Sequence, residues 1–155
     1  MKCEGTNFSH TFVRIRSKSI DRDLIYQATS SGVHFVGSVL FESSAQVVEE
    51  YQIPVSDEDR KRLLRWAVDN AGKPYGYLQL LGIGLIRLAK IVGINIGNPF
   101  SNGDKAYVCC ELVAEALQGL GILVSDKLDQ VDLTVTRDIV RRTALALRKG
   151  QDVVI

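Results

Sequence analysis

The chain has 155 residues and a formal net charge of +1, with 46% hydrophobic and 24% charged residues. These values are ordinary for a globular protein, and they give no overall field that would attract a nucleic acid. The length suits one compact core, so we expect a single domain over residues 1–155 and no nucleic-acid partner.

The three cysteines are Cys3, Cys109 and Cys110. An odd count with two adjacent residues does not resemble a disulfide framework, and the spacing lacks the paired CxxC units of a structural zinc site. We therefore predict free thiols in a reducing compartment and no metal. No apolar run follows Lys2, so we expect no secretory signal and a cytoplasmic protein where it is synthesised, with its site of action left open.

The first third of the chain has the alternating pattern of β-strands. Apolar and polar residues alternate over Thr11–Arg16 and again over Asp23–Ala28, with a polar turn at Ser17–Arg22 between them. Val33–Phe41 is rich in β-forming residues, and we expect a further short strand to end near Ile53–Val55.

The rest of the chain has helical patterns. Ser56 and Asp59 form a capping box ahead of an apolar stripe, and Gly72 is the expected end of that helix. We predict further helices over Tyr77–Val92, from Val108 to Gly119 or Gly121, and from Thr134 or Thr136 to Gly150, with a loop over Gly97–Gly103. Strands followed by helices predict an α+β domain in which a small antiparallel sheet packs against helices.

Cys109 and Cys110 stand at the start of a predicted helix. A thiol in the first helical turn lies near the positive end of the macrodipole, which lowers its pKa and favours the nucleophilic thiolate. Backbone N–H groups at the same place can stabilise a developing oxyanion. The alternative is that both cysteines are small buried hydrophobic residues.

A thiol nucleophile needs a base, and the chain has two histidines, His10 and His34. His10 precedes the first predicted strand, an edge position from which its imidazole can reach a site. Gln27 can orient His10 if both lie on one sheet face. A hairpin register in which paired residue numbers add to 37 or 39 would place Gln27 beside or diagonal to His10.

Two segments resemble a family of cell-wall peptidases. Gly72-Lys73-Pro74-Tyr75 is followed, after an apolar insertion, by Cys109-Cys110-Glu111-Leu112-Val113 and then by Gly119 or Gly121. The NlpC-type peptidases are similar, with G-x-P-Y and then C-S-G/E-L-V. Their common arrangement places the histidine after the cysteine, which this chain excludes because no histidine follows Cys109.

The permuted branch of this superfamily resembles the chain in order as well. It has Ser-His at the first strand, then (E/Q)-A and G-V, as in Ser9-His10, Gln27-Ala28 and Gly32-Val33. The resemblance covers roughly residues 8–123. It implies a permuted papain-like fold with the nucleophile at a helix N-terminus.

The resemblance also implies roles for individual residues. Cys109 takes the nucleophile position, His10 the base and Gln27 the third polar position, while Tyr75 is expected to line the substrate site. Cys110 stands where the family often has serine, so the neighbouring thiol stays open as the nucleophile. The implied activity is a cysteine peptidase or amidase that acts on a peptide or amide, such as peptidoglycan, without a cofactor.

Two other functions remain open. Lecithin–retinol-acyltransferase-like proteins use a similar permuted His and Cys pair on phospholipid acyl groups, but they usually have a second histidine where this chain has Gln27. A non-catalytic interaction domain on the same fold is the other alternative. Thiol reactivity separates it from an enzyme, because an inert, buried Cys109 would fit binding and not hydrolysis.

The apolar segment Leu78–Ile96 allows two interpretations. Polar residues interrupt it, at Gln79, Arg87, Lys90 and Asn95, so we predict no membrane-spanning helix. It can be a lid or lipid-contacting surface, or a mostly buried helix. We favour the buried helix over membrane contact, which stays the less favoured alternative.

Overall fold

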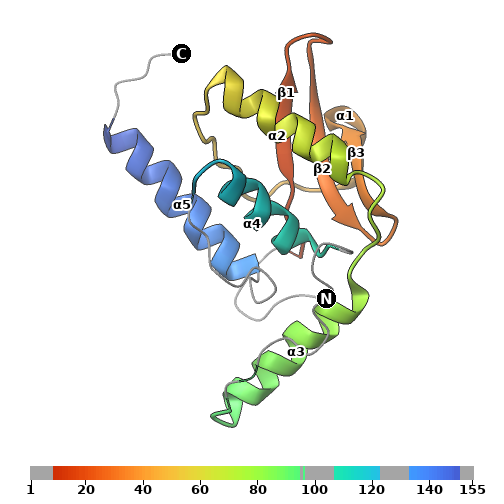
Figure 1. Ribbon diagram of the computed structural model, residues 1–155, viewed down its shortest axis with the longest axis vertical. Helices are drawn as coiled ribbons and strands as arrows, with labels where there is room; N and C mark the ends of the chain where they lie inside the picture. Colours follow the sequence, from red (N-terminus) through yellow and green to blue (C-terminus); the bar gives the residue numbers. More distant parts are fainter. Residues whose placement is uncertain (1–8, 95, 97–106, 123–132, 151–155) are drawn as a thin grey trace.

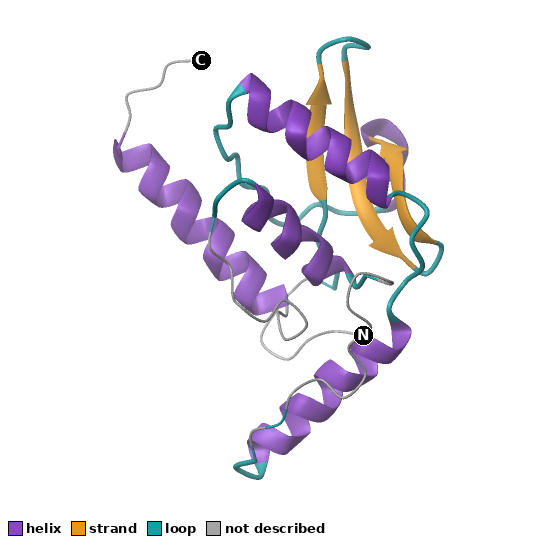
Figure 2. Ribbon diagram, viewed as in Figure 1, coloured by secondary structure: helices purple, strands orange, loops and turns teal. Residues whose placement is uncertain are grey.

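The computed structural model describes residues 9–94, 96, 107–122 and 133–150. In these residues the protein is α+β, with a three-stranded antiparallel sheet in the order β1-β2-β3 and five helices (Figure 1). The strands are β1 (Val13–Ser17), β2 (Arg22–Thr29) and β3 (Gly32–Gly37). The helices are α1 (Ser38–Ser44), α2 (Asp57–Asn70), α3 (Tyr77–Ile91), α4 (Cys109–Gly119) and α5 (Leu133–Gly150). Figure 2 shows the three strands side by side with helices next to the sheet, and the sequence colours of Figure 1 place these strands in the first part of the chain.

The register of the sheet decides which side chains share a face. Val13 pairs with Tyr26 across β1 and β2, so paired residue numbers add to 39, which is one of the two registers predicted from the sequence. In β2 and β3, Gln27 pairs with His34 across a tight turn at residues 30–31. Because side chains alternate along a strand, Gln27 and His34 lie on one face and Tyr26 on the other.

Two predictions about the segment after the sheet are wrong. The β-rich run Val33–Phe41 leaves the sheet at Gly37 and continues as α1, whose Phe41 is buried and packs edge-on against the ring of Phe12 with centroids 4.7 Å apart. The helix returns an aromatic ring to the sheet, which a straight strand would carry away from it. Near Ile53–Val55 the structure has no strand, consistent with the missing backbone N–H of Pro54.

The helix predictions agree closely with the structure. The Ser56 hydroxyl accepts a hydrogen bond from the Asp59 N–H at 3.0 Å, which is the expected cap of α2. α3 and α4 begin and end within one or two residues of the predicted limits, and α5 begins one residue before Thr134. The loop predicted over Gly97–Gly103 lies outside the described residues.

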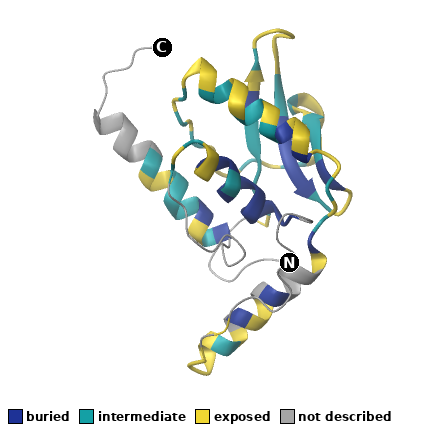
Figure 3. Ribbon diagram, in the orientation of Figure 1, coloured by how far each residue is buried: buried dark blue, intermediate teal, exposed yellow. Residues whose placement is uncertain are grey.

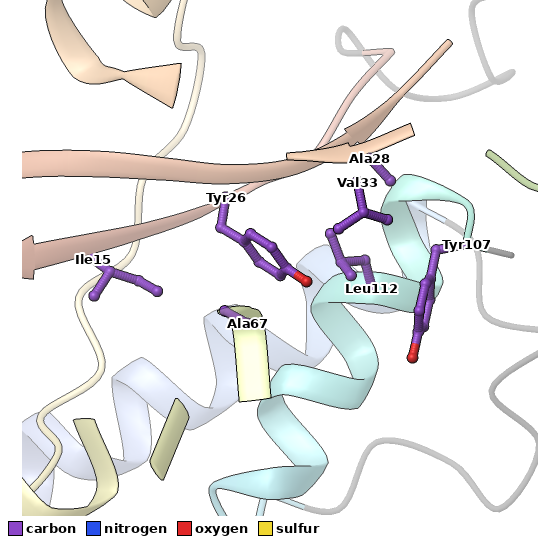
Figure 4. Close-up of a cluster of buried hydrophobic side chains, with 7 residues drawn as sticks. All are labelled: Ile15, Tyr26, Ala28, Val33, Ala67, Tyr107 and Leu112. Carbon is purple, nitrogen blue, oxygen red and sulfur yellow. The ribbon is translucent and has the colours of Figure 1, made fainter. Parts of the chain in front are cut away.

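The main core lies between the sheet and the helices α2 and α4 (Figure 1). Tyr26 is fully buried and points from β2 towards Ala67 of α2 and Leu112 of α4 (Figure 4). Its ring also meets that of Trp66 edge-on at 5.7 Å. This packing fixes the start of α4 relative to the sheet, and so determines where Cys109 lies.

α3 is different, because it projects from the rest of the molecule (Figure 1). The prediction of a mostly buried helix is wrong for its outer face, where Leu88 and Ile91 are 63% and 79% exposed (Figure 3). Among the described residues, no other helix or strand packs along α3 to cover that face. None of the helices in the described ranges has both the length and the apolarity needed to cross a membrane.

Candidate functional site

Cys109 is the first residue of α4, with Val108 at the N-cap. The preceding residue, Tyr107, is held by two backbone hydrogen bonds to the segment before α3: its N–H donates to Pro74 O at 3.1 Å, and its carbonyl accepts from the Gly76 N–H at 2.9 Å. With Leu112 packed in the core, the helix start is fixed on both sides. Cys109 is only 7% exposed.

His10 lies three residues before β1 and is partly buried. It lies close enough to Cys109 for the two groups to shift each other's pKa. Its Nε2 lies 2.9 Å from Oε1 of Gln27, and since this oxygen can only accept, Nε2 carries the hydrogen. The structure therefore brings together the three residues Cys109, His10 and Gln27 that the sequence singled out, in the order thiol, imidazole, amide.

The pKa values of the two adjacent cysteines are shifted in opposite directions. The pKa of Cys109 is lowered most by a hydrogen bond from Cys110. Hydrogen bonding to His10, the positive charge of His10 and the N–H of Thr11 lower it further. Together these effects outweigh burial, which would raise the pKa. The pKa of Cys110 is raised, because it donates to Cys109 and is itself buried beside the Cys109 charge. Cys109 is thus the thiolate, and Cys110 keeps its proton.

The imidazole of His10 is shifted in the complementary direction. Burial alone would lower the pKa of His10, but hydrogen bonding to Cys109, the negative charge on that sulfur and the hydrogen bond to Gln27 together raise it. A lowered thiol pKa and a raised imidazole pKa describe a thiolate–imidazolium pair, the charged form in which an activated cysteine is nucleophilic.

Tyr75 packs against the cluster that contains Cys109. Its ring is part of the cluster around Val108, Cys109 and Cys110. Burial, with the negative charge of Cys109 next to it, raises the pKa of Tyr75 to about 12, so its hydroxyl stays protonated. Tyr75 is therefore a neighbour of the sulfur, in a position from which it can contact a molecule bound there.

Sequence reasoning missed His34. Gln27 Nε2 lies 3.3 Å from His34 Nε2, and His34 Nδ1 lies 3.0 Å from the carbonyl oxygen of Gly32. Both histidines of the chain are therefore connected through Gln27. The register argument that was used for the first hairpin, applied to the two-residue turn at residues 30–31, would have paired Gln27 with His34.

A large open groove of about 1180 Å³ lies next to the site, between β1, the segment 44–55, α4 and α5. His10 lines this groove, whereas Cys109, Gln27 and Tyr75 do not. Its volume exceeds the roughly 300–1,000 Å³ of a typical ligand pocket, so the groove alone does not define a ligand. The contacts between thiol, imidazole and amide locate the candidate site.

No family model matches the chain, and neither a curated protein nor a solved structure does. Across the described ranges, no group of three or more His, Cys, Asp or Glu side chains is arranged to hold a metal ion. The function is therefore inferred from the residues and geometry of this chain.

Proposed function

We propose that the protein is a cysteine hydrolase with a permuted papain-like fold, in which Cys109 is the nucleophile, His10 the general acid and base, and Gln27 the residue that orients His10. The observation that supports it best is the proximity of Cys109 and His10, with the thiol pKa lowered and the imidazole pKa raised, while His10 is held by Gln27. Buried thiols that serve only as packing do not need a charged partner.

In the first half of the reaction, the Cys109 thiolate attacks the carbonyl carbon of an amide, and the carbonyl π electrons move to oxygen. N–H groups at the start of α4 stabilise this oxyanion. The tetrahedral intermediate collapses as the C–N bond breaks, and the His10 imidazolium gives its proton to the leaving amine. The product is an acyl-thioester on Cys109 with neutral His10.

In the second half, neutral His10 removes a proton from water, and the resulting hydroxide attacks the thioester carbonyl. The C–S bond breaks, the acid leaves, and Cys109 returns to the thiolate with His10 protonated. Gln27 keeps the hydrogen on His10 Nε2 throughout, so the other ring nitrogen, Nδ1, exchanges the proton. An amide orients the ring as a carboxylate would, but it stabilises the imidazolium less.

Cys110 has a supporting role in this proposal. Its S–H donates to the Cys109 sulfur, and its raised pKa keeps that proton in place. Serine, which relatives in the resembling family often have here, can make the same donation with its hydroxyl. Alanine cannot donate a hydrogen bond. Comparing Cys110→Ser with Cys110→Ala therefore separates the effect of hydrogen-bond donation from that of packing.

The proposed substrate is a peptide or another amide, with peptidoglycan peptides as the first class to test, because the Gly72–Tyr75 and Cys109–Val113 segments resemble those of cell-wall peptidases. A phospholipid acyl group is the second candidate, and the exposed apolar face of α3 favours it. A common acyl-thioester on Cys109 would serve both reactions.

The decisive experiment is alkylation with iodoacetamide near neutral pH, followed by peptide mapping and by assays with muropeptides and with short-chain phospholipid vesicles. We expect Cys109 to react ahead of Cys110 and Cys3, Cys109→Ala to abolish turnover, and Cys110→Ser to retain most of it. Cys110→Ala should slow both alkylation and turnover.

Other outcomes have definite meanings. Dominant alkylation of Cys110 would move the nucleophile by one residue. Slow and equal alkylation of all three cysteines, without turnover, would contradict the enzyme and favour a non-catalytic interaction domain. Phospholipid turnover without amide cleavage would keep Cys109 as nucleophile and replace the substrate class.

A further inference from the structure

α3 has an apolar outer face that nothing in the described part of the chain covers. Its exposed large side chains follow helical spacing, since Leu85, Leu88 and Val92 are separated by three and four residues and Ile91 lies beside them. Ile94, just beyond the helix, is also exposed. In Figure 3 much of the projecting helix α3 is coloured as exposed. Contiguous apolar surface of this kind marks an interaction site.

The charge of this segment restricts the kind of partner. Residues 70–103 contain no Asp or Glu, and their charged residues are Lys73, Arg87 and Lys90. An apolar face within a purely basic segment is complementary to a surface that is apolar inside and negatively charged outside. An anionic lipid bilayer has that chemistry.

The length of α3 determines how it could meet a bilayer. Its 15 residues extend about 22 Å, which is shorter than the roughly 30 Å hydrocarbon core. We propose that α3 docks the protein on anionic bilayers by lying in the interface, with the face formed by Leu85, Leu88, Ile91 and Val92 in the acyl region. This proposal is independent of the reaction catalysed at Cys109.

Docking would also place the candidate site close to the bilayer. Tyr77 is the first residue of α3, and its ring meets that of Tyr75 with centroids 5.0 Å apart. Tyr75 in turn packs against Cys109. The candidate site thus lies next to the N-terminal end of α3.

The test uses the full chain carrying Cys109→Ala, so that binding is measured without turnover. Vesicles of phosphatidylcholine alone and of equimolar phosphatidylcholine and phosphatidylglycerol are compared by flotation. We expect binding to the anionic vesicles that weakens as salt is raised, and a loss of about tenfold or more for Leu88→Ser with Ile91→Ser.

A matched control replaces two equally exposed residues on another helix. Val39 and Leu40 of α1 are 80% and 66% exposed, so Val39→Ser with Leu40→Ser removes similar apolar surface and should leave binding unchanged. Absence of binding to anionic vesicles, or equal loss in both double variants, would overturn the proposal. So would a dimer in sedimentation that only the α3 variant dissociates, because the face would then join two copies of the chain.

A different observation, the hydrogen-bond chain behind His10, carries a second inference. The carbonyl oxygen of Gly32 can only accept, so the hydrogen of neutral His34 is on Nδ1 and its Nε2 is an acceptor. The Gln27 amide nitrogen must then face His34, which leaves Gln27 Oε1 facing His10. One backbone carbonyl therefore fixes the direction of every hydrogen bond up to His10.

From this geometry we infer that His34 is a positioning residue, which holds the Gln27 amide in the orientation that keeps hydrogen on His10 Nε2. The inference rests on the proposed pair of Cys109 and His10. Without an acceptor at position 34, the amide can rotate and present its N–H groups to His10, which disfavours the tautomer needed to accept the thiol proton.

The test measures alkylation of Cys109 as a function of pH for His34→Leu and His34→Gln. Leucine removes the acceptor and should slow alkylation below neutral pH by about five- to tenfold, whereas glutamine supplies an acceptor oxygen and should restore most of the rate. Nitrogen NMR of His10, recorded above its raised pKa where the ring is neutral, should show hydrogen on Nε2 in the wild type and in His34→Gln, and a mixture of tautomers in His34→Leu.

The failures of the two ideas can be told apart. An unchanged pH profile and tautomer in His34→Leu would overturn the role of His34 and leave Cys109 as the nucleophile. A wild-type Cys109 that reacts no faster than the other cysteines would instead overturn the proposed function itself.

Discussion

α3 and α4 are both apolar helices that begin two residues after the bridge between Tyr75 and Tyr107, yet one is largely exposed and the other is buried. In α4, Leu112 is fully buried and seven further residues are buried with it. In α3, Leu88 and Ile91 are largely exposed. An apolar composition therefore indicates that a helix has apolar surface, but not whether the rest of its own chain buries that surface. α4 builds the candidate site, and α3 offers a surface beside it.

The largest effect that tests this contrast is a pair of leucine truncations. Leu112→Ala should lower the free energy of unfolding by about 2–5 kcal/mol, because it leaves a cavity between the sheet and α4. Leu88→Ala removes the same atoms from an exposed position and should change it by less than about 0.5 kcal/mol. Urea unfolding followed by circular dichroism measures both; similar losses would mean that α3 is packed in solution.

A glycine pair tests the same contrast on the backbone. Gly32 has φ +95°, and a Cβ there would lie 2.7 Å from the carbonyl oxygen of Lys73, so Gly32→Ala should cost about 2–3 kcal/mol. Gly93, after the end of α3, has φ +78° with open space around it, so Gly93→Ala should cost only the strain, about 1 kcal/mol. Thermal unfolding compares the two variants, and equal costs would contradict a tight contact at Gly32.

The third prediction concerns the ionised pair of Cys109 and His10 at the start of α4. Since the pKa of Cys109 is lowered and that of His10 raised, the thiolate–imidazolium pair persists from acidic pH up to the raised pKa of His10. His10→Gln should slow alkylation at weakly acidic pH by about tenfold or more, as the thiol returns towards its ordinary range. Turnover should decline as pH rises through the pKa of His10, because the leaving amine then lacks its acid. A wild-type alkylation profile with an ordinary thiol pKa would exclude the pair.

The smallest expected effect has the opposite sign. Gly84 lies within α3, and a methyl group added there would meet nothing within 4 Å, so Gly84→Ala should stabilise the helix by about 0.5–1 kcal/mol. Hydrogen exchange of the α3 amides should slow by the corresponding factor, with no change in α4. Faster exchange would show that position 84 is in contact with a partner.

The sequence predicted what depends on local rules. Ser56 before an acidic first turn set the start of α2. The alternation in the first hairpin allowed two registers that put Gln27 on the face of His10, and the structure has the one that places them diagonally. These patterns act within a few residues, or across one tight turn, so a single sequence contains them. The meeting of Cys109 with His10 came from a resemblance and not from a local rule.

The missed features depend on contacts distant in sequence. Val33–Phe41 has the composition of a strand throughout, yet its second half is helical, with Phe41 packed on the distant Phe12. The exposed face of α3 has a pattern that would equally suit a core helix. The largest contribution to the lowered pKa of Cys109 comes from its neighbour Cys110, whereas the sequence had suggested the helix dipole.

The parallel bridge between Tyr75 and Tyr107 has a mechanical consequence. Its two hydrogen bonds join the segment that leads into α3 to the segment that leads into α4, only two residues before Cys109. α3, which is about 22 Å long, begins directly after Gly76, whose N–H makes one of these two bonds. A movement of α3 about this segment would therefore either break the two hydrogen bonds or displace Tyr107, which lies two residues before Cys109.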